Sequence, residues 1–330
     1  MQTASKKVIN GWAMYDWANS AYSLIITSAI FPAYYTAIAP AQVHMFGRVF
    51  DRSALASYAI SFSFLLMACI SPILSSIADY KGNKKAFMQF FTYVGSAACC
   101  SMFFFTKDNI SFGIIASVVA SIGYCGSIVF YNAYLPEIAA EEDQDRISAK
   151  GFTMGYIGSV LLMIVCLAAI MMNDKMNLGW GAYPARLSFL AVGIWWAGFA
   201  QITFNRLPPS KIPEQHAEYN LFTNGFHELK KVWFELKHHP NLSKFLRGFF
   251  FYNMGVQTVM YLATYFASDE LKMESSQLII TVLIIQIVAI LGATLFSKLS
   301  DKTNNIFTLC TLICIWILIC YFASIVTTIS

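Results

Sequence analysis

The sequence has few charged residues. Only 12% of its 330 residues are Asp, Glu, Lys or Arg, against about 25% in soluble globular domains. Charge is missing altogether from nine windows of 19 to 31 residues: 17–47, 53–78, 86–106, 109–136, 151–173, 187–205, 248–268, 275–297 and 303–330. A helix needs about 20 apolar residues to cross a hydrocarbon layer roughly 30 Å thick. This pattern excludes a soluble enzyme, a secreted domain and a nucleic-acid binder, and it predicts a polytopic membrane protein.

The windows also lack the alternation of polar and apolar residues that marks the strands of membrane barrels, which are about 10 residues long. Every backbone polar group in lipid needs a partner within the protein, so helices are the remaining way to span. We therefore expect an all-α membrane protein with about nine transmembrane helices.

Residues that would support redox, metal or ATP chemistry are missing from the windows. The five histidines lie in loops or at a window rim, so no helix offers the ligands that a haem requires. The Gly-x-x-x-x-Gly-Lys phosphate loop is absent, and the eight cysteines show no metal-ligand spacing. We expect no enzymatic activity, no metal and no cofactor.

The basic residues are unevenly distributed among the loops. With a cytoplasmic amino terminus, alternating loops place 16 Lys and Arg inside and 6 outside, as the positive-inside rule requires. We therefore expect a multi-pass protein of a bacterial-type inner (cell) membrane, with its amino terminus in the cytoplasm.

The longest loop, 207–244, divides the chain into an N-terminal six-helix bundle, 1–206, and a partial C-terminal bundle of three helices, 245–330. Prolines at 208, 209 and 213 predict that the linker begins without helix. An amphipathic surface helix ended by Pro240 is predicted by apolar residues spaced by three or four: Phe222, Phe226, Leu229, Trp233 and Leu236. A simple connector is the alternative interpretation.

One loop pattern occurs twice, six helices apart. Residues 79–85 (Asp-Tyr-Lys-Gly-Asn-Lys-Lys) follow the second window, and residues 301–305 (Asp-Lys-Thr-Asn-Asn) follow the eighth. Gly82 and Asn304 share a position where a left-handed backbone would be needed, and Gly and Asn are the residues that tolerate it.

Residues 79–85 resemble the cytoplasmic loop signature of the major facilitator superfamily, and the layout of two bundles joined by a long loop is also similar. Three further stretches are similar to its vacuole-effluxer-like branch: 15–22 (Tyr-Asp-Trp-Ala-Asn-Ser-Ala-Tyr), 130–139 (Phe-Tyr-Asn-Ala-Tyr-Leu-Pro-Glu-Ile-Ala) and 252–258 (Tyr-Asn-Met-Gly-Val-Gln-Thr). The resemblance implies major facilitator-type helical bundles. It also implies a secondary active transporter that exports an amino acid or similar metabolite by alternating access. Met254 stands where this resemblance leads us to expect an acidic residue.

Uncharged hydrogen-bonding residues of the first, fourth and seventh helices are candidates for the substrate path, because the resemblance implies that these helices line a central cavity. Without it they would be read as contacts between helices. These residues are Asn19, Tyr22, Tyr131, Asn132, Asn253 and Gln257. Amides and hydroxyls can match both an ammonium and a carboxylate. Since no basic residue lies in the windows, we expect a small polar or zwitterionic solute.

Asp16, at the head of the first window, has two interpretations. A carboxylate retained within a membrane is usually functional, which favours a role toward the solute or a coupling proton. A capping or gate-forming role at the helix amino terminus is the alternative.

The repeated loops supply the candidate gate. The resemblance implies that they latch the outward-open state through Asp79, Gly82, Lys84, Lys85 and Asp301. Glu137 and Arg146 either join this network or form a solvated face. Glycines at 151, 155 and 158 predict that another helix approaches the fifth one closely.

The lipid bilayer and a small-molecule solute are the expected partners, with a coupling proton left open. Neither nucleic acid nor an obligate protein partner is indicated. The second bundle stops after three helices, so helices 10 to 12 are expected to be absent, through either a fragment or a shortened gene. The alternative function is therefore a truncated or degenerate family member that acts as a non-transporting membrane protein.

Overall fold

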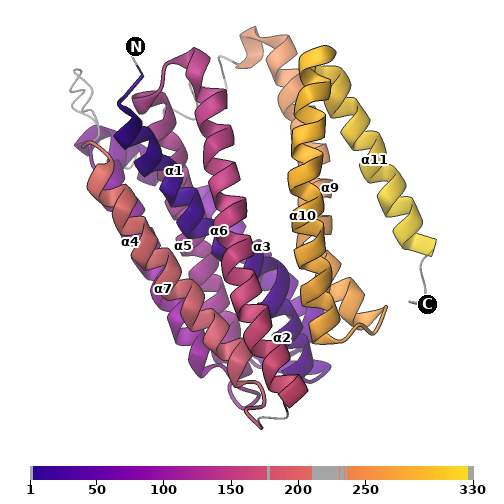
Figure 1. Cartoon of the computed structure of the whole chain (residues 1–330). Helices are drawn as coiled ribbons and strands as arrows, with labels where there is room; N and C mark the ends of the chain where they lie inside the picture. The colour runs from indigo at the N-terminus through magenta and orange to yellow at the C-terminus, as the bar shows by residue number, and fades with distance from the viewer. Residues whose placement is uncertain (1–2, 177–178, 210–229, 231–233, 235, 326–330) are drawn as a thin grey trace.

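The computed structural model describes residues 3–176, 179–209, 230, 234 and 236–325, and nearly all of them are helical (Figure 1). Each of the nine windows holds a helix. The first consists of α1 (Lys6–Ala21), η1 (Tyr22–Ala29) and α2 (Ile30–Ile38). It is followed by α3 (Arg52–Lys81), α4 (Lys84–Ser101) with the short η2 (Met102–Phe104), α5 (Ile110–Ile138), α6 (Glu141–Met176), α7 (Tyr183–Arg206), α9 (Pro240–Asp269), α10 (Ser275–Lys302) and α11 (Asn305–Ile325).

Within the described residues, seven of these helices are long and apolar enough to cross a membrane by length and composition. They are the α1–η1–α2 segment, α3, α4, α5, α6, α7 and α11, and the other two long helices are α9 and α10. The all-α membrane fold predicted from the missing charge is confirmed.

The first helix begins earlier than its charge-free window. It starts at Lys6, with Ser5 at the N-cap position. Asp16 therefore lies ten residues inside the helix, about 15 Å from its start at 1.5 Å per residue. Since free helical N–H groups occur only in the first turn, the capping interpretation of Asp16 is wrong.

The middle of this helix is a π-helix, Tyr22–Ala29, which the sequence analysis did not predict. It ends at Ala29, whose backbone leaves helical geometry (φ −127°, ψ −82°), and Pro32 follows in the first turn of α2. In an α-helix the carbonyl of Ser28 would accept from the N–H of residue 32, which proline lacks. The first helix therefore offers a backbone carbonyl to another helix near its midpoint.

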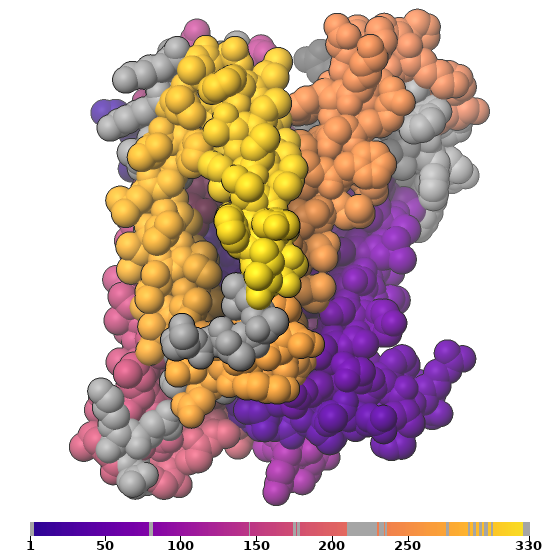
Figure 2. All heavy atoms as spheres, turned by 90° about the vertical axis from the view of Figure 1, so that its right-hand side faces the viewer, coloured from indigo at the N-terminus to yellow at the C-terminus, as the bar shows by residue number. Residues whose placement is uncertain are grey.

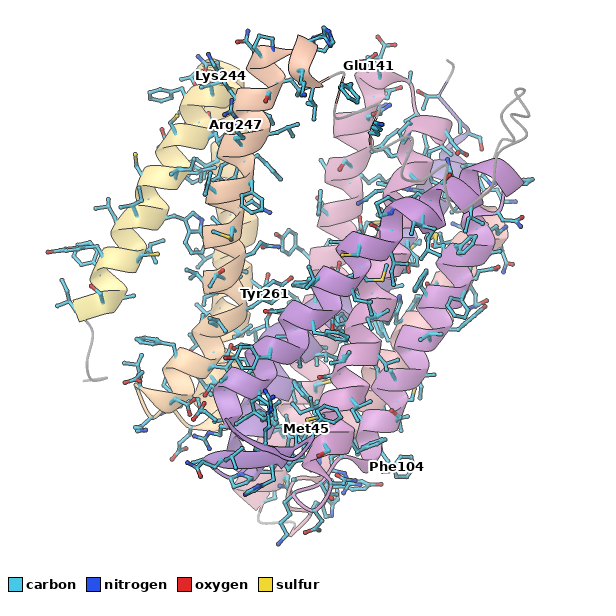
Figure 3. All side chains as sticks on the ribbon, turned by 180° about the vertical axis from the view of Figure 1, so that it is seen from behind. Met45, Phe104, Glu141, Lys244, Arg247 and Tyr261 are labelled. Atoms are coloured by element: carbon cyan, nitrogen blue, oxygen red, sulfur yellow. The ribbon has the colours of Figure 1, made fainter. Side chains whose placement is uncertain are left out.

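A two-stranded hairpin interrupts the helical pattern between the first two spans. Strands β1 (Gln42–Met45) and β2 (Arg48–Asp51) pair antiparallel, with Met45 opposite Arg48. The two turn residues, Phe46 and Gly47, both have positive φ (51° and 73°), as a two-residue type I′ hairpin turn requires. Met45 lies at the same end of the molecule as Phe104, and this end is called the hairpin end below (Figure 3).

Helices α1 to α7 pack into one bundle, in which α4 contacts α5 and α1 contacts α6 and α7. Glycine permits the closest approaches. A methyl group on Gly123 of α5 would lie 2.5 Å from the Cα of Gly95 on α4. On α6, the predicted glycine face meets α1, because methyl groups at Gly151, Gly155 and Gly158 would strike Asp16, Ser20 and Trp17 respectively. The close approach predicted from the glycine spacing is confirmed.

The three later helices stand beside this bundle, with α11 on the outside of α9 and α10 (Figures 1 and 2). Helix α9 contacts η1 and α2, and α10 contacts α2, η1 and α6. The buried residues of α9 are Thr264 and Tyr265, close to the hairpin end, whereas residues 240–251 at the opposite end are nearly all exposed. This opposite end, which carries Glu141, Lys244 and Arg247, is called the basic end below (Figure 3). The two groups of helices therefore meet at the hairpin end.

The two repeated loops differ in their backbones. Gly82 has a φ of +62°, which confirms the left-handed turn predicted there. Asn304 does not have a positive φ, so the same prediction is wrong for the second loop. Its side-chain oxygen accepts from the N–H of Phe307 at 2.7 Å and caps α11.

Most of the predicted amphipathic helix, including Phe222, Phe226, Leu229 and Trp233, lies outside the described residues, and Pro240 is the first residue of α9.

Candidate functional site

Asp16 of α1 and Tyr131 of α5 are in direct contact. The Tyr131 hydroxyl donates to Asp16 Oδ2 at 2.7 Å, although the two residues are 115 positions apart. Tyr131 is itself fixed, because its ring stacks on Trp12 at 4.3 Å and the Trp12 indole N–H donates to its backbone carbonyl. The sequence prediction placed Asp16 and Tyr131 on different helices, and the fold brings them together.

Among the described residues, no Lys, Arg or His side chain forms an ion pair with Asp16. Gly151 of α6 lies directly against the carboxylate and the Tyr131 hydroxyl, so a side chain there would fill the space. Next along the chain, Tyr15 is fully buried and its hydroxyl bonds Thr92 Oγ1 at 2.6 Å. A partly buried carboxylate held by one neutral donor within a helix bundle is suited to take up a proton or a small cation.

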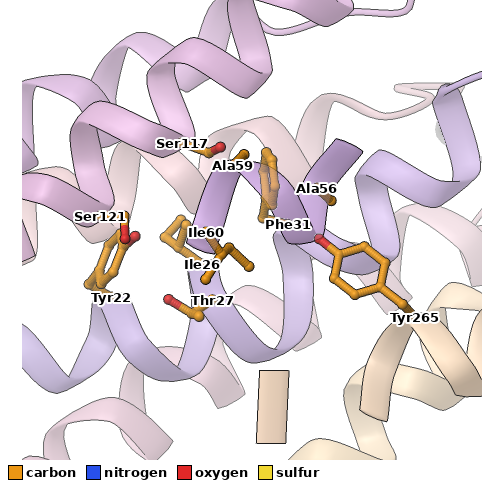
Figure 4. A pocket seen from close by; sticks show the side chains of 10 residues that line it. All are labelled: Tyr22, Ile26, Thr27, Phe31, Ala56, Ala59, Ile60, Ser117, Ser121 and Tyr265. Carbon is orange, nitrogen blue, oxygen red and sulfur yellow. The ribbon is translucent and has the colours of Figure 1, made fainter. Parts of the chain in front are cut away.

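A small cavity lies between the two groups of helices (Figure 4). It measures about 20 Å³, which is room for about one water molecule. Its lining comes from η1, α2, α3, α5 and α9, and the polar residues in it carry only hydroxyl groups: Tyr22, Thr27, Ser117, Ser121 and Tyr265. Tyr22, predicted as part of the substrate path, is thus placed in the wall of this cavity.

Tyr265 reaches this cavity from α9 and directs its hydroxyl toward the α1–α7 bundle (Figure 4). The residue is only 4% exposed, and its hydroxyl has no hydrogen-bond partner in the described part of the chain. Buried tyrosine hydroxyls are normally satisfied. The cavity therefore offers an unused donor and acceptor.

The hairpin end is closed by contacts between α9 and the first bundle. Asp269 of α9 forms an ion pair with Arg52 (Nη2 to Oδ1, 2.6 Å) and accepts a hydrogen bond from the Ser53 hydroxyl. Just beyond the charge-free window, Asp269 is partly buried, which raises its pKa. The hydrogen bonds from Ser53 and Arg52, with the charge of Arg52, outweigh this and hold the pKa below its usual range. Thr264 donates to the Ser28 carbonyl at 2.6 Å.

The basic end carries ionic contacts within the first bundle. Lys84, at the start of α4, pairs with Glu137, at the end of α5, and both side chains are about 15% exposed. Lys85 donates to the carbonyl of Leu207 at 3.1 Å. Glu137 therefore joins the loop network, whereas Arg146 pairs with Asp143 three residues earlier on α6.

The remaining predicted residues are less connected. Asn19 is buried, and its amide nitrogen has no partner in the described residues. Asn132 and Gln257 are exposed and Asn253 is half-buried, and in the part of the chain that the structure describes none of them is hydrogen-bonded to Asp16 or lines the cavity. Asp79 and Asp301 fall within α3 and α10, and their side chains lie outside the described part of the structure.

Sequence reasoning missed the residues of the hairpin end. Arg52 and Asp269 stand just outside charge-free windows and were assigned to loops, and Thr264 and Tyr265 were absorbed into an apolar span. Pro32 was the available signal, because a proline inside a span frees a carbonyl that a neighbouring helix must satisfy. Over the described residues, no group of three His, Cys, Asp or Glu could hold a metal ion.

Comparisons with known proteins agree with the resemblance noted in the sequence. Residues 4–329 match the family model described as "Vacuole effluxer Atg22 like". The chain is 32% identical over 320 residues to the "Uncharacterized MFS-type transporter YxiO" of Bacillus subtilis, covering 95% of this chain and 72% of that protein.

Fungal proteins are more distant. Identity is 24% over 309 residues to "Autophagy-related protein 22-1" of Aspergillus terreus, and 22% over 329 residues to "Autophagy-related protein 22" of Yarrowia lipolytica. The chain spans 50% and 55% of their lengths, about half of each. No solved structure matches the chain. With its all-helical membrane fold and a family match over nearly its whole length, the chain belongs to the vacuole effluxer Atg22-like family of major facilitator-type membrane proteins.

Proposed function

We propose that the protein is a secondary active transporter that moves a small solute by alternating access, with the solute bound between the two groups of helices. The observation that carries this proposal is the asymmetry of their contacts. At the hairpin end, Asp269 and Thr264 bridge the groups, and the cavity lies beside these contacts. At the basic end, the facing part of α9 is exposed. A carrier open to one side has this arrangement.

The lining of the cavity supports a solute without strong net charge. Hydroxyl groups alone provide its polarity, so both hydrogen-bond donors and acceptors are present but no fixed charge lies in the wall. An amino acid or a similar polar metabolite fits this chemistry. The volume seen here admits only about one water, so solute binding requires the walls to move apart.

Asp16 supports coupling to a proton. Its carboxylate lies inside the first span, bonded to Tyr131 and unpaired with any cation in the described residues. A charged carboxylate in such a place is costly, and protonation removes the cost. We propose that Asp16 binds and releases the coupling proton, while the cavity binds the solute.

The distribution of Lys and Arg supports a cytoplasmic basic end, since 16 of the 22 basic residues fall on that side. In that orientation the described state is open toward the cytoplasm. An inner (cell) membrane and net export follow as the favoured assignment.

Transport by the purified chain in proteoliposomes tests this function. Solute accumulation driven by an imposed pH gradient is compared with counterflow, which needs no gradient, across a panel of amino acids. Asp16→Asn should lose gradient-driven accumulation and keep counterflow. The matched control is Asp108→Asn, at an exposed acid outside the spans, which should keep both.

Each possible result leads to a distinct conclusion. If Asp16→Asn accumulates solute like the unmodified chain, proton coupling through Asp16 is refuted. If the unmodified chain neither accumulates nor exchanges any solute in the panel, the transporter proposal fails and the non-transporting alternative is favoured.

A further inference from the structure

Three residues within two turns of α9 face the first bundle, and each makes a different contact. Thr264 donates to the Ser28 carbonyl, Tyr265 places its hydroxyl in the cavity, and Asp269 binds Arg52 and Ser53. Tyr265 and Asp269 are four residues apart, and therefore lie on one face of the helix. This short stretch of α9 thus joins the cavity to the closed hairpin end.

The Thr264 contact depends on the position of α9. Pro32 deprives the Ser28 carbonyl of its usual donor within the helix, and the Thr264 hydroxyl replaces that donor at 2.6 Å. Thr264 is 5% exposed, so water has little access to this bond. If α9 moved away from η1, the carbonyl would lose this donor. This hydrogen bond therefore favours the state in which the hairpin end is closed.

The partner of Asp269 in the first bundle, Arg52, is itself held in place. Arg52 is fixed on the end of α2, because its Nη1 donates to the Thr36 carbonyl at 2.8 Å and its own carbonyl accepts from the Tyr35 hydroxyl. Its guanidinium is thus already placed when Asp269 arrives. Both side chains of the pair are about 25% exposed, so salt screens the pair more than it screens the Thr264 bond.

Tyr265 differs from its two neighbours because its hydroxyl has no partner in the described residues. It points into a cavity whose other polar groups are also hydroxyls (Figure 4). One of these, Ser117, already donates to the Ile114 carbonyl, so it has acceptor capacity left. A solute with both an acceptor oxygen and a donor group would complement this wall.

We propose that residues 264–269 of α9 form the gate at the hairpin end, and that Tyr265 within it donates to an acceptor oxygen of the bound solute. Thr264 and Asp269 are positioning residues that hold the gate shut. The solute contact rests on the proposed transport function, whereas the gate itself is a property of the protein without solute. The ligand class is a small solute with a carboxylate or carbonyl oxygen.

The gate is tested without solute by hydrogen exchange of backbone amides, read by mass spectrometry on the full chain in lipid nanodiscs. Thr264→Val and Asp269→Asn should each speed exchange in the hairpin, residues 42–51. The expected factor for Thr264→Val is about tenfold, which corresponds to about 1.4 kcal/mol for one hydrogen bond. Thr264→Ser should restore the exchange rate of the unmodified chain.

Matched controls exist on the same helix. Thr258→Val removes a hydroxyl whose one hydrogen bond to the described residues is to Met254 of its own helix, and it should leave hairpin exchange unchanged. Arg52→Gln should reproduce the effect of Asp269→Asn, because either change breaks the same ion pair. If Asp269→Asn fails to fold, Arg52→Gln tests the ion pair in its place. Unchanged hairpin exchange in Thr264→Val, or equal acceleration in Thr258→Val, overturns the gate.

The solute contact is tested by counterflow of each amino acid that the unmodified chain transports. Tyr265→Phe should raise the half-saturating concentration about tenfold and leave hairpin exchange unchanged. Tyr252→Phe, on the same helix and away from the cavity, should change neither. An unaltered half-saturating concentration in Tyr265→Phe overturns the role of Tyr265. Absence of counterflow by the unmodified chain overturns the proposed function, while the exchange result still decides the gate.

Discussion

Replacement of Gly151 by alanine tests the seam between α1 and α6, where Asp16 lies. The added methyl carbon would stand 3.0 Å from the Tyr131 hydroxyl oxygen and 3.1 Å from the Trp12 ring, and closer still to Asp16 Oδ2. Neither aromatic residue can yield easily, because Trp12 and Tyr131 are stacked and buried. The helices must therefore separate, or the bond between Asp16 and Tyr131 must break.

The size of the effect follows from packing. Overfilling a close-packed interior costs about 1–3 kcal/mol. Alanine also favours helix over glycine by about 1 kcal/mol, which would obscure the cost. Gly198→Ala provides the reference, because Gly198 lies in helix α7 and no atom from another described helix lies within 4 Å of the added carbon. Both variants gain the same helix propensity from alanine, so only the packing cost separates them. Their free energies of unfolding should therefore differ by about 1–3 kcal/mol.

Reversible unfolding in mixed micelles, followed by circular dichroism, measures this difference. We expect Gly151→Ala to unfold more easily than the unmodified chain, and Gly198→Ala to be as stable as the unmodified chain or slightly more so. Gradient-driven transport should fall in Gly151→Ala alone. If the two variants had equal stability, the described contact between α6 and Asp16 would be refuted.

Three further predictions concern the two ends of the molecule. Glu137→Gln removes the carboxylate that Lys84 binds in a largely buried setting, so we expect a loss of about 1–3 kcal/mol in thermal or denaturant unfolding, and equal stability would contradict the contact. The pKa of Asp269 is below its usual range in the folded protein, so its stabilisation is complete above the unfolded pKa of about 4 and is lost as the pH falls through the lower folded value. Below pH 4, therefore, the unfolding temperature of the unmodified chain should approach that of Asp269→Asn, and a constant difference would refute the pair. Asn304→Ala removes the cap on the Phe307 N–H and should raise amide exchange at the start of α11, by a factor equivalent to about 0.5–2 kcal/mol, without affecting the hairpin.

Much of the fold could be predicted because lipid imposes a simple rule. Charge-free windows located all nine long helices of the described residues, since a span cannot carry many charges. The start of the first helix was missed for the same reason, because Lys6, Lys7 and Asp16 fall outside an uncharged window while remaining helical. The hairpin at 42–51 was missed because its alternating residues were read as part of an apolar run, although Gly47 marks its turn.

The candidate site was predictable only in part. The family-like stretches placed Asp16 and Tyr131 among the candidates, and their hydrogen bond joins them. Pro32 signals a distortion of the first helix, but the bond between Thr264 and Ser28 also requires a distant helix to dock there, and no local sequence pattern encodes that docking. For Asn304 the sequence predicts a left-handed backbone, because asparagine tolerates that geometry. In the structure its side chain caps helix α11 instead.

The central claim is that a solute crosses between the two groups of helices, and counterflow in proteoliposomes tests it most directly. Vesicles containing purified protein are loaded with an unlabelled amino acid and diluted into the same compound in labelled form, without any ion gradient. We predict transient accumulation of label that is weakened in Tyr265→Phe and retained in Tyr252→Phe. No accumulation with any amino acid in the panel, or identical uptake by protein-free vesicles, would contradict the account.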